Sequence, residues 1–411
     1  LAEDTTGGDT WLRPAKQNEK RQALRSAYDK LVGFGDKNLY YVYREQLFNF
    51  TAAEDKFVSP TTDGLHVNDL GNQAMTDFYV SFLPTIISMS PPVDTSMPVS
   101  FGLHEDMVVA EWDFDKYPVE ENVVDFSSEG WDWTHIERLS LMGRAFNDTP
   151  TKLNRLPTRA QGVVSASAWK SSLDSTGVFI AFETNATMIS FYYKLTSDGS
   201  ALWHMPMTST SGVDLYRFDE ASGVWGFLGN AKLFPAEGQP VLAPLTNLMP
   251  ELDKPSRYLL FLPLRKEVAW AYVGVNKGAS TPRKNGAFAS DGVTINGKKP
   301  IVWFGNSKAQ VGAASRPGCI YTNILMRSLG RVILNMDFAS GASTEVGAFD
   351  FLVEIDAEMI VIEYLWITNG AWVTNVTGQA VRSIRRVRPN TPIILAEGGY
   401  SAGHGFPESF D

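Results

Sequence analysis

The 411-residue sequence contains one cysteine, Cys319, and it has no long apolar run. A single thiol cannot form an intrachain disulfide, so the cysteine content does not indicate a redox compartment. No apolar stretch reaches the roughly 18 residues that a membrane-spanning helix needs, and we expect no membrane span. Basic residues are also few: 36 Lys and Arg stand against 46 Asp and Glu, a net charge of -10. Phosphate binding needs concentrated basic residues, so we expect no nucleic-acid partner.

What the sequence does contain is typical of a compact globular protein. Hydrophobic residues make up 44% of the chain, which includes 34 glycines and 22 prolines. This length favours two domains, or one domain with insertions. His104, His135 and His404 show no metal-ligand spacing, and no glycine loop suited to a phosphate is present. We therefore expect neither a metal nor a cofactor.

Residues 296–411 alternate short apolar strands with helical patterns. Continuous apolar strands separated by helices are typical of a parallel sheet covered on both faces, so this third is expected to be α/β. The expected strands are Lys299–Phe304, Arg331–Met336, Met359–Leu365 and Pro392–Ala396.

Residues 1–88 predict a helix at Gln17–Val32, a strand at Asn38–Tyr43 and a helix at Leu70–Phe82. A lone buried strand would leave both of its backbone edges unpaired, so it needs another sheet to join. The C-terminal third can supply that sheet. We predict one five-stranded, doubly wound parallel sheet that is split between the two chain ends.

Residues 125–295 differ in kind, because short alternating strands follow one another with turn signals between them. This pattern predicts an antiparallel β-sandwich or jelly roll, inserted between the two halves of the α/β domain. The Pro-rich, acidic residues 89–124 are predicted to be a linker. Trp131, Trp133 and Trp203 could belong to the sandwich core or to a sugar-stacking surface, and we favour the core.

Three stretches carry a family resemblance: Ile301–Ser307 with Gly312–Gly318, Asp63–His66 with Asn68–Gly71, and Trp131–Tyr216. The first resembles the strand and nucleophile turn of an SGNH (GDSL-like) hydrolase subfamily, and the second resembles its Asp-x-x-His block. The third is similar to the sandwich domain that precedes the hydrolase domain in that subfamily. The resemblance implies a serine hydrolase with Ser307, His66 and Asp63 as its catalytic triad.

The order of these blocks differs from the family, because here the Asp-x-x-His block precedes the nucleophile block. In addition, Leu395-Ala-Glu397 recurs as Leu1-Ala-Glu3. We interpret the chain as one unit of a tandem polyprotein cut within its repeats, or as a circular permutation. Residues 1–88 would then complete their own sheet or a neighbour's, and the second case gives a homo-oligomer or polymer.

Serine, histidine and aspartate side chains together can catalyse ester hydrolysis. A serine hydroxyl becomes nucleophilic when an imidazole removes its proton and a carboxylate orients that imidazole. Ser307 follows an apolar strand, at the edge where α/β sites are built. Asp63 and His66 are three residues apart, so one loop can present both of them.

The oxyanion hole is where the sequence departs from the family. The family's glycine falls at Ser340 unless Gly341 takes its place, and its asparagine falls near Ile367 unless Asn369 serves. Two functions therefore stay open. One is an esterase acting on acyl or acetyl esters, of carbohydrates or of other small molecules. The other is a secreted structural or carbohydrate-binding protein with a degenerate hydrolase site.

Four N-x-S/T sequons occur, at Asn49, Asn147, Asn185 and Asn375. They favour an extracellular or secretory location, with these asparagines as glycosylation candidates. The sequence begins at Leu1 and not at Met, so we also expect a processing boundary upstream.

Overall fold

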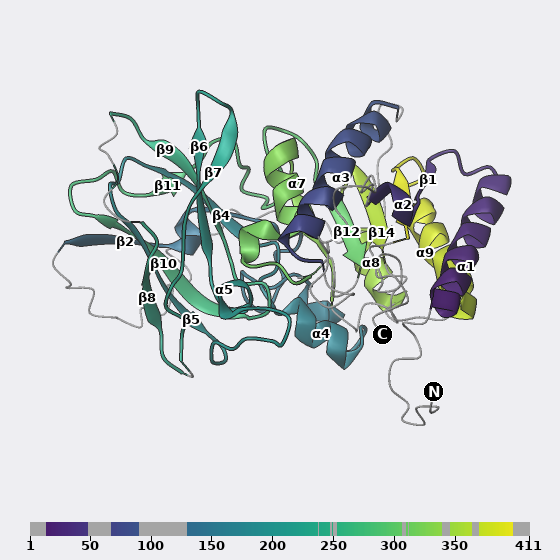
Figure 1. The fold of residues 1–411 in the computed structure, drawn as a ribbon, viewed down its shortest axis with the longest axis horizontal. Helices are drawn as coiled ribbons and strands as arrows, with labels where there is room; N and C mark the ends of the chain where they lie inside the picture. The colour runs from purple at the N-terminus through teal and green to yellow at the C-terminus, as the bar shows by residue number, and fades with distance from the viewer. Residues whose placement is uncertain are drawn as a thin grey trace, which may run out of the picture.

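The structure is a computed structural model of the chain. It describes residues 14–47, 67–89, 130–236, 238–246, 249, 253–305, 310, 312–338, 346–363 and 370–397. A β-sandwich and an α/β domain lie side by side, with the sandwich at the left of Figure 1 and the α/β domain at the right. This arrangement confirms the predicted fold class.

The α/β domain is built on a five-stranded parallel sheet in the order β1-β15-β14-β12-β13. Its strands are β1 (Leu39–Val42), β12 (Ile301–Gly305), β13 (Ile333–Asn335), β14 (Met359–Glu363) and β15 (Ile393–Ala396). Every residue of β12, β14 and β15 is buried. Both sheet faces are therefore covered, which is why these strands are continuous apolar runs.

Strand β1 comes from the opposite end of the chain and pairs in parallel with β15, so that Leu39 lies opposite Ile393 and Val42 opposite Ala396. The unpaired strand predicted near the N-terminus thus joins the sheet formed by the C-terminal third. With β1 at its edge, the open sheet has five strands.

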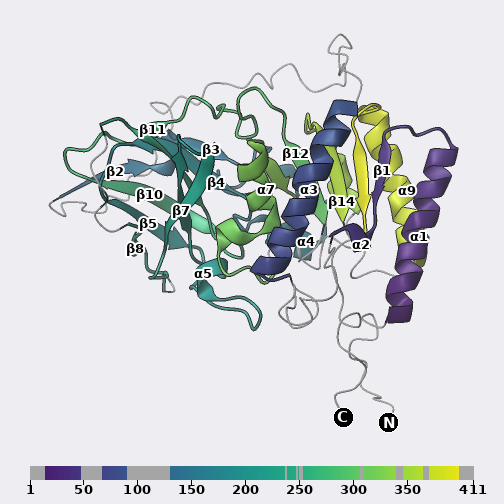
Figure 2. The same cartoon turned by 45° about the horizontal axis from the view of Figure 1, so that its top comes forward.

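Helices cover both faces of this sheet. Helix α1 (Pro14–Gly33) packs on α9 (Gly370–Val387), and α3 (Asp69–Met89) packs on α7 (Tyr321–Leu329). Figure 2 shows the two pairs on opposite sides of the strands. The short helices α2 (Arg44–Leu47) and α8 (Phe349–Leu352) complete the layers. Helix α3 runs on to Met89, beyond the predicted end at Phe82.

The sandwich consists of two antiparallel sheets. One has the order β2-β10-β5-β8, and its strands are β2 (Trp131–His135), β10 (Val268–Asn276), β5 (Ile189–Leu195) and β8 (Val241–Pro244). The other has the order β11-β4-β9-β6-β7, and β3 also pairs with β4. Its strands are β3 (Ser140–Met142), β4 (Phe179–Thr184), β6 (Asp214–Asp219), β7 (Val224–Asn230), β9 (Ser256–Phe261) and β11 (Arg283–Lys284). Two short helices, α4 (Ala166–Ser172) and α5 (Met207–Thr210), lie in its connections.

The tryptophans that we expected in the sandwich core are not there. Trp131 and Trp133 are only partly buried and lie outside the apolar cluster between the two sheets, and Trp203 is 76% exposed. The core prediction was wrong for Trp131 and Trp133 because β2 is an edge strand whose large side chains face outward, and for Trp203 because it lies in the exposed connection between β5 and α5. The core is filled instead by residues such as Phe191 and Tyr193 of β5.

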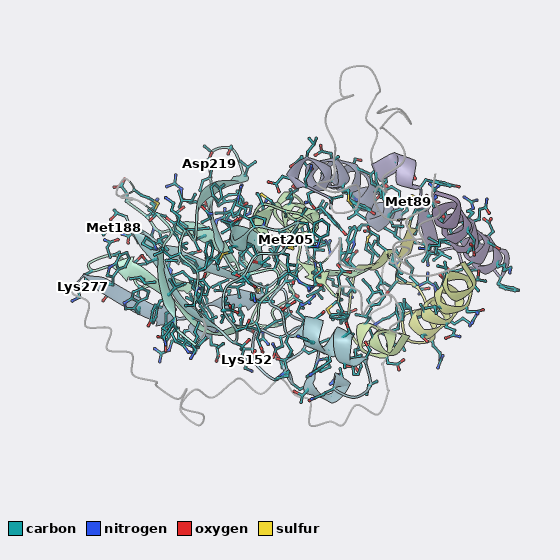
Figure 3. All side chains as sticks on the ribbon, turned by 60° about the horizontal axis from the view of Figure 1, so that its bottom comes forward. Met89, Lys152, Met188, Met205, Asp219 and Lys277 are labelled. Carbon is teal, nitrogen blue, oxygen red and sulfur yellow. The ribbon has the colours of Figure 1, made fainter. Side chains whose placement is uncertain are left out.

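The two domains share packed apolar side chains. One continuous cluster joins Phe179 and Phe261 of the sandwich to Trp303 of the parallel sheet. Met205, which Figure 3 labels near the middle of the molecule, packs in a smaller cluster with Leu264, Ala314 and Ile320. Gly177 (φ +75°) approaches so closely that a Cβ there would lie 2.8 Å from the Cβ of Asn335. The sandwich therefore packs directly against the parallel sheet, next to the candidate site.

Candidate functional site

The predicted active-site residues lie outside the described part of the chain. They are Ser307, His66 and Asp63 of the triad, and Ser340, Gly341 and Asn369 of the oxyanion hole. All six assignments therefore stay predictions. The described residues on either side of them show how the surroundings of the site are built.

Gly305 is the last described residue before Ser307, the predicted nucleophile. It is the last residue of β12 and is paired with Glu363 at the end of β14. Carboxyl ends of parallel strands meet at one edge of a sheet, where α/β binding sites form. The chain therefore leaves β12 at this edge, two residues before Ser307 in the sequence.

The start of α3 is hydrogen-bonded to the chain that follows the nucleophile turn. Ala313 N donates to the carbonyl oxygen of Val67 at 2.7 Å, and Ser315 N donates to Asp69 Oδ1 at 2.9 Å. Tyr321 N donates to Asn72 Oδ1 at 3.0 Å. Val67 directly follows His66, so these bonds bring the end of the Asp-x-x-His block to the nucleophile block.

Sandwich side chains hold Gln310, three residues after Ser307. Arg265 Nη1 donates to Gln310 Oε1 at 3.0 Å, and Gln310 Nε2 donates to Asp174 Oδ2 at 3.2 Å. Burial raises the pKa of Asp174 to about 6, while the charges of Arg265 and Arg155 oppose that rise. The sandwich is thus part of the framework around the candidate site.

Arg155 is fully buried at the junction of the two domains. Its guanidinium donates to the carbonyl oxygens of Asn335 at 2.9 Å, Asp337 at 2.7 Å and Asp174 at 3.0 Å. Burial lowers the pKa of Arg155 to about 10, so the group stays protonated at neutral pH. The charged guanidinium of a sandwich residue therefore holds in place the backbone at the end of β13, which leads toward Ser340.

Two buried carboxyl groups lie at this edge of the sheet. Trp303 Nε1 and Tyr321 Oη both donate to Glu363 Oε2, at 3.2 Å and 3.0 Å. Burial raises the pKa of Asp337 well above its usual range, and the nearby charge of Glu363 raises it further. Two nearby buried carboxyls do not both ionise readily, which favours the protonated form of Asp337, although the charge of Arg155 opposes this shift.

Asp214 joins the sandwich to the loop before α7. Gly318 N donates to Asp214 Oδ2 at 2.9 Å, and Arg316 Nε lies 3.2 Å from the same oxygen. A Cβ at Gly318 would lie 2.3 Å from Tyr216 Oη, so only glycine lets the Tyr216 ring pack there. Burial raises the pKa of Asp214 to about 7 despite the nearby arginines.

The remaining predicted features are placed in part. Asn147 and Asn375 are exposed, whereas Asn185 is half-buried and its Oδ1 accepts from Ser280 N at 2.7 Å; Asn49 lies outside the described residues. In the described part of the chain, no three His, Cys, Asp or Glu side chains are grouped to hold a metal ion. No described helix is long and apolar enough to cross a membrane.

Arg155, Gln310 and Asp214 were not predicted to support the site. Arg155 and Asp214 fall within stretches that carry the family resemblance. A lone charged residue nevertheless gives no sign that it will be buried. These supporting roles are seen only in the hydrogen bonds that the three side chains make in the folded protein.

Two family models match the chain. The N-terminal domain of SGNH-hydrolase-type esterases, called GxDLY, matches residues 131–281. The GDSL-like lipase/acylhydrolase family matches residues 298–406. These matches confirm the resemblance seen in the sequence. Neither model spans residues 1–88, so the permuted order stays a prediction.

The chain is also similar to parts of several solved structures. A protein from Bacteroides ovatus described as a GDSL-like lipase is 27% identical, with a TM-score of 0.57, covering 64% of this chain and 73% of that one. The salicylyl-acyltransferase SsfX3 from a tetracycline biosynthetic pathway is 16% identical, with a TM-score of 0.45 and coverage of 64% and 68%. A family two carbohydrate esterase from Clostridium thermocellum is 12% identical, with a TM-score of 0.31 and coverage of 56% and 74%. A search of curated proteins gave no significant match.

Proposed function

We propose that the protein is a serine esterase, because residues 131–281 match the N-terminal domain of SGNH-type esterases and residues 298–406 match the GDSL-like lipase/acylhydrolase family. The proposed substrates are acyl or acetyl esters of carbohydrates or other small molecules. The proposed catalytic residues are Ser307, His66 and Asp63.

The observation that supports this proposal is the hydrogen bond from Ala313 N to the carbonyl oxygen of Val67, 2.7 Å long. It ties the residue after His66 to the loop after Ser307, although the two blocks are far apart in sequence. A triad needs its imidazole within hydrogen-bond reach of the serine. This contact is consistent with that requirement.

In the proposed reaction, Ser307 Oγ attacks the ester carbonyl carbon while His66 takes its proton. The tetrahedral intermediate collapses to an acyl-enzyme, and His66 returns the proton to the departing alcohol. Water then gives a proton to His66 and attacks the acyl carbon; the Ser307 Oγ–acyl bond breaks, the acid is released, and His66 returns the proton to Ser307 Oγ. Asp63 orients the imidazole and stabilises its protonated form.

The backbone N–H groups that follow Ser307 and Gly341, together with the Asn369 amide, are the proposed oxyanion donors. A single such donor contributes about 3–4 kcal/mol to lowering a barrier of this kind. Substitution at two of the family's donor positions, now Ser340 and Ile367, favours a second candidate function. That candidate is a structural or carbohydrate-binding protein that has kept the hydrolase fold and lost its activity.

Hydrolysis of p-nitrophenyl acetate and butyrate by the wild type, Ser307→Ala and His66→Ala separates the two functions. For an esterase we expect either substitution to lower kcat by about 1,000-fold or more. The Thr208→Ala variant, which loses a bond to the Ser315 carbonyl oxygen, serves as a control for changes elsewhere on the loop. Equal hydrolysis rates for the wild type and Ser307→Ala would contradict the proposed esterase activity.

The order of segments and the location of the protein are further proposals. We propose that residues 1–88 can complete the sheet of a neighbouring copy, giving an oligomer or polymer. Light scattering over a dilution series tests this, because an exchanged assembly persists on dilution.

We also propose an extracellular or secretory location, supported by the exposure of Asn147 and Asn375. Unchanged mobility after glycosidase treatment of protein from a secreting eukaryotic host would count against glycosylation.

A further inference from the structure

The outer face of the sheet β2-β10-β5-β8 carries a row of aromatic rings. Side chains alternate along a strand, and the inward residues of β5 and β10, such as Phe191 and Val273, fill the sandwich core. The outward residues of β2, β5 and β10 include six partly buried rings: Trp131, Trp133, His135, Tyr192, Trp270 and Tyr272. Figure 1 shows these strands at the end of the molecule away from the parallel sheet. Met188 and Lys277, which border β5 and β10, lie at that same end in Figure 3.

The six rings form a continuous row across the sheet, in which each ring lies next to the following one. Trp131 and Trp133 have ring centroids 5.9 Å apart, and Trp133 and Tyr192 are 6.0 Å apart. The row continues from Tyr192 to Trp270 at 5.2 Å, from Trp270 to Tyr272 at 5.9 Å, and from Tyr272 to His135 at 4.9 Å. Each ring is therefore held by its neighbours before any ligand arrives, which lowers the entropic cost of binding.

Gly274 makes the centre of this row possible. It lies opposite Trp133 in β2, and a Cβ there would be 2.4 Å from Trp133 Cζ3 and 2.7 Å from Cε3. The indole therefore lies on the bare backbone of β10 and reaches Tyr192 on the strand beyond. A glycine inside a strand often marks such a close approach.

The face is almost uncharged, although the chain has a net charge of -10. Its other outward residues, set by the strand registers, are Ser190, Lys194, Leu242, Pro244, Gly274 and Asn276. Lys194 is the single formal charge among the outward residues of these four described strands at neutral pH. Burial lowers the pKa of His135, which keeps that ring neutral. A polyanion would need several cations here, so the charge pattern favours an uncharged ligand.

The size of the face argues against a second protein chain as its occupant. Three strands spaced about 4.8 Å apart and five residues at about 3.3 Å each give an area on the order of 200 Å². A stable protein interface buries about 800 Å² per partner. A ligand only a few rings long fits this area better.

We propose that this aromatic face is a binding site for a neutral oligosaccharide segment. The apolar C–H faces of successive sugar rings stack on Trp133, Tyr192 and Trp270, and the hydroxyl groups at the ring edges stay in water or meet Lys194 and Asn276. This face lies on the sandwich, away from the parallel sheet, and its binding does not depend on the proposed esterase activity.

Native affinity electrophoresis of the whole chain tests this site in gels containing hydroxyethyl cellulose, arabinoxylan, galactomannan or pullulan. We expect at least one of these neutral polymers to retard the wild type. Trp133→Ala and Trp270→Ala should each weaken that binding by roughly tenfold or more. Trp203→Ala removes an exposed tryptophan outside the row, and Ser307→Ala removes the proposed nucleophile; both should bind like the wild type.

Three results would overturn the proposal. The first is that no neutral polymer retards the folded wild type. The second is that Trp133→Ala and Trp270→Ala bind normally, or that Ser307→Ala abolishes binding. The third is a dimer, seen by light scattering, that Trp131→Ala dissociates, which would assign the face to a second copy. If Trp133→Ala does not fold, Gly274→Ala replaces it, because a methyl group there displaces the same indole from its place in the row.

Discussion

Arg155 Nη1 of the sandwich donates a 2.7 Å hydrogen bond to the carbonyl oxygen of Asp337, just beyond the end of β13. This bond and its neighbours compensate a charge that has no access to water. Removing the guanidinium leaves several buried carbonyl oxygens without their donor, so we expect Arg155→Ala to lower the free energy of unfolding by about 3–5 kcal/mol.

Arg155→Lys should restore little of this stability, because an ammonium cannot match the planar fork of the guanidinium. Arg159→Ala is the matched control. That exposed arginine pairs with Asp148 and Glu354, and its loss should cost less than about 1 kcal/mol. Urea unfolding measures all three variants. Similar losses for Arg155→Ala and Arg159→Ala would contradict the structural role of Arg155.

Asp214→Asn should change how stability depends on pH. The pKa of Asp214 is raised to about 7 in the folded protein, from an ordinary value of 3.8, chiefly by burial. The folded state therefore holds this proton more tightly than the unfolded state. The stability that the group contributes is present below about pH 4 and is lost as the pH rises to about 7.

Asparagine cannot ionise, yet it can still accept the bond from Gly318 N. Relative to the wild type, Asp214→Asn should therefore gain on the order of 3 kcal/mol of stability between pH 4 and pH 7, and little more above that. Urea unfolding of both proteins at several pH values measures the difference. Two parallel pH profiles would show that Asp214 does not titrate in this range.

Tyr321 and Tyr79 offer a matched pair of buried hydroxyl groups. Both rings pack edge-on against Trp303, with centroid distances of 5.3 Å and 4.7 Å. Tyr321 Oη donates to Glu363, whereas Tyr79 Oη has no hydrogen-bond partner among the described residues. Tyr321→Phe should cost about 1.5–3 kcal/mol, and Tyr79→Phe should be neutral or slightly stabilising. Chemical unfolding that gave the reverse order would disprove this view of the Glu363 site.

Gly177 tests the fit between the two domains. Its φ of +75° is unfavourable for alanine, and a Cβ would lie 2.8 Å from Asn335 Cβ. Gly177→Ala should cost about 3 kcal/mol, from backbone strain together with the clash. Gly162 has a similar φ of +83° with nothing within 4 Å of a Cβ, so Gly162→Ala should cost only about 1–2 kcal/mol. Equal melting temperatures for the two variants would mean that the domains tolerate the added methyl.

The parallel sheet was predictable because its strands are continuous apolar runs, from Ile301 in β12 to Ala396 in β15. The place of β1 followed from a general requirement that a buried strand must pair. The edge strands of the sandwich were harder to predict. Strand β2 turns its tryptophans outward and so inverts the expected pattern. Strand β7 contains Gly226 and Gly229 and has no fully buried residue.

The sequence predicts the site only as a set of residue types around Ser307, and these assignments stay predictions. Its supports are long-range contacts, and nothing near Arg155 in the sequence indicates that its partners are Asn335 and Asp337. Similarly, the row of rings needs the register that sets Trp133 opposite Gly274. Pairings of this kind depend on the whole fold, and local sequence does not determine them.

The pairing of Leu39 with Ile393 also sets an order of events during biosynthesis. Leu39 and Ile393 are about 350 residues apart in sequence, so the ribosome makes β1 long before its partner β15. At roughly 5–20 residues per second, β1 waits for about 20 seconds or longer before that partner exists. The sandwich and strands β12–β14 can form during this interval, whereas β1 cannot yet pair with β15. The pairing of β1 with β15 is then a late step in the folding of these two domains, and at high protein concentration it competes with addition of the same strand from another chain.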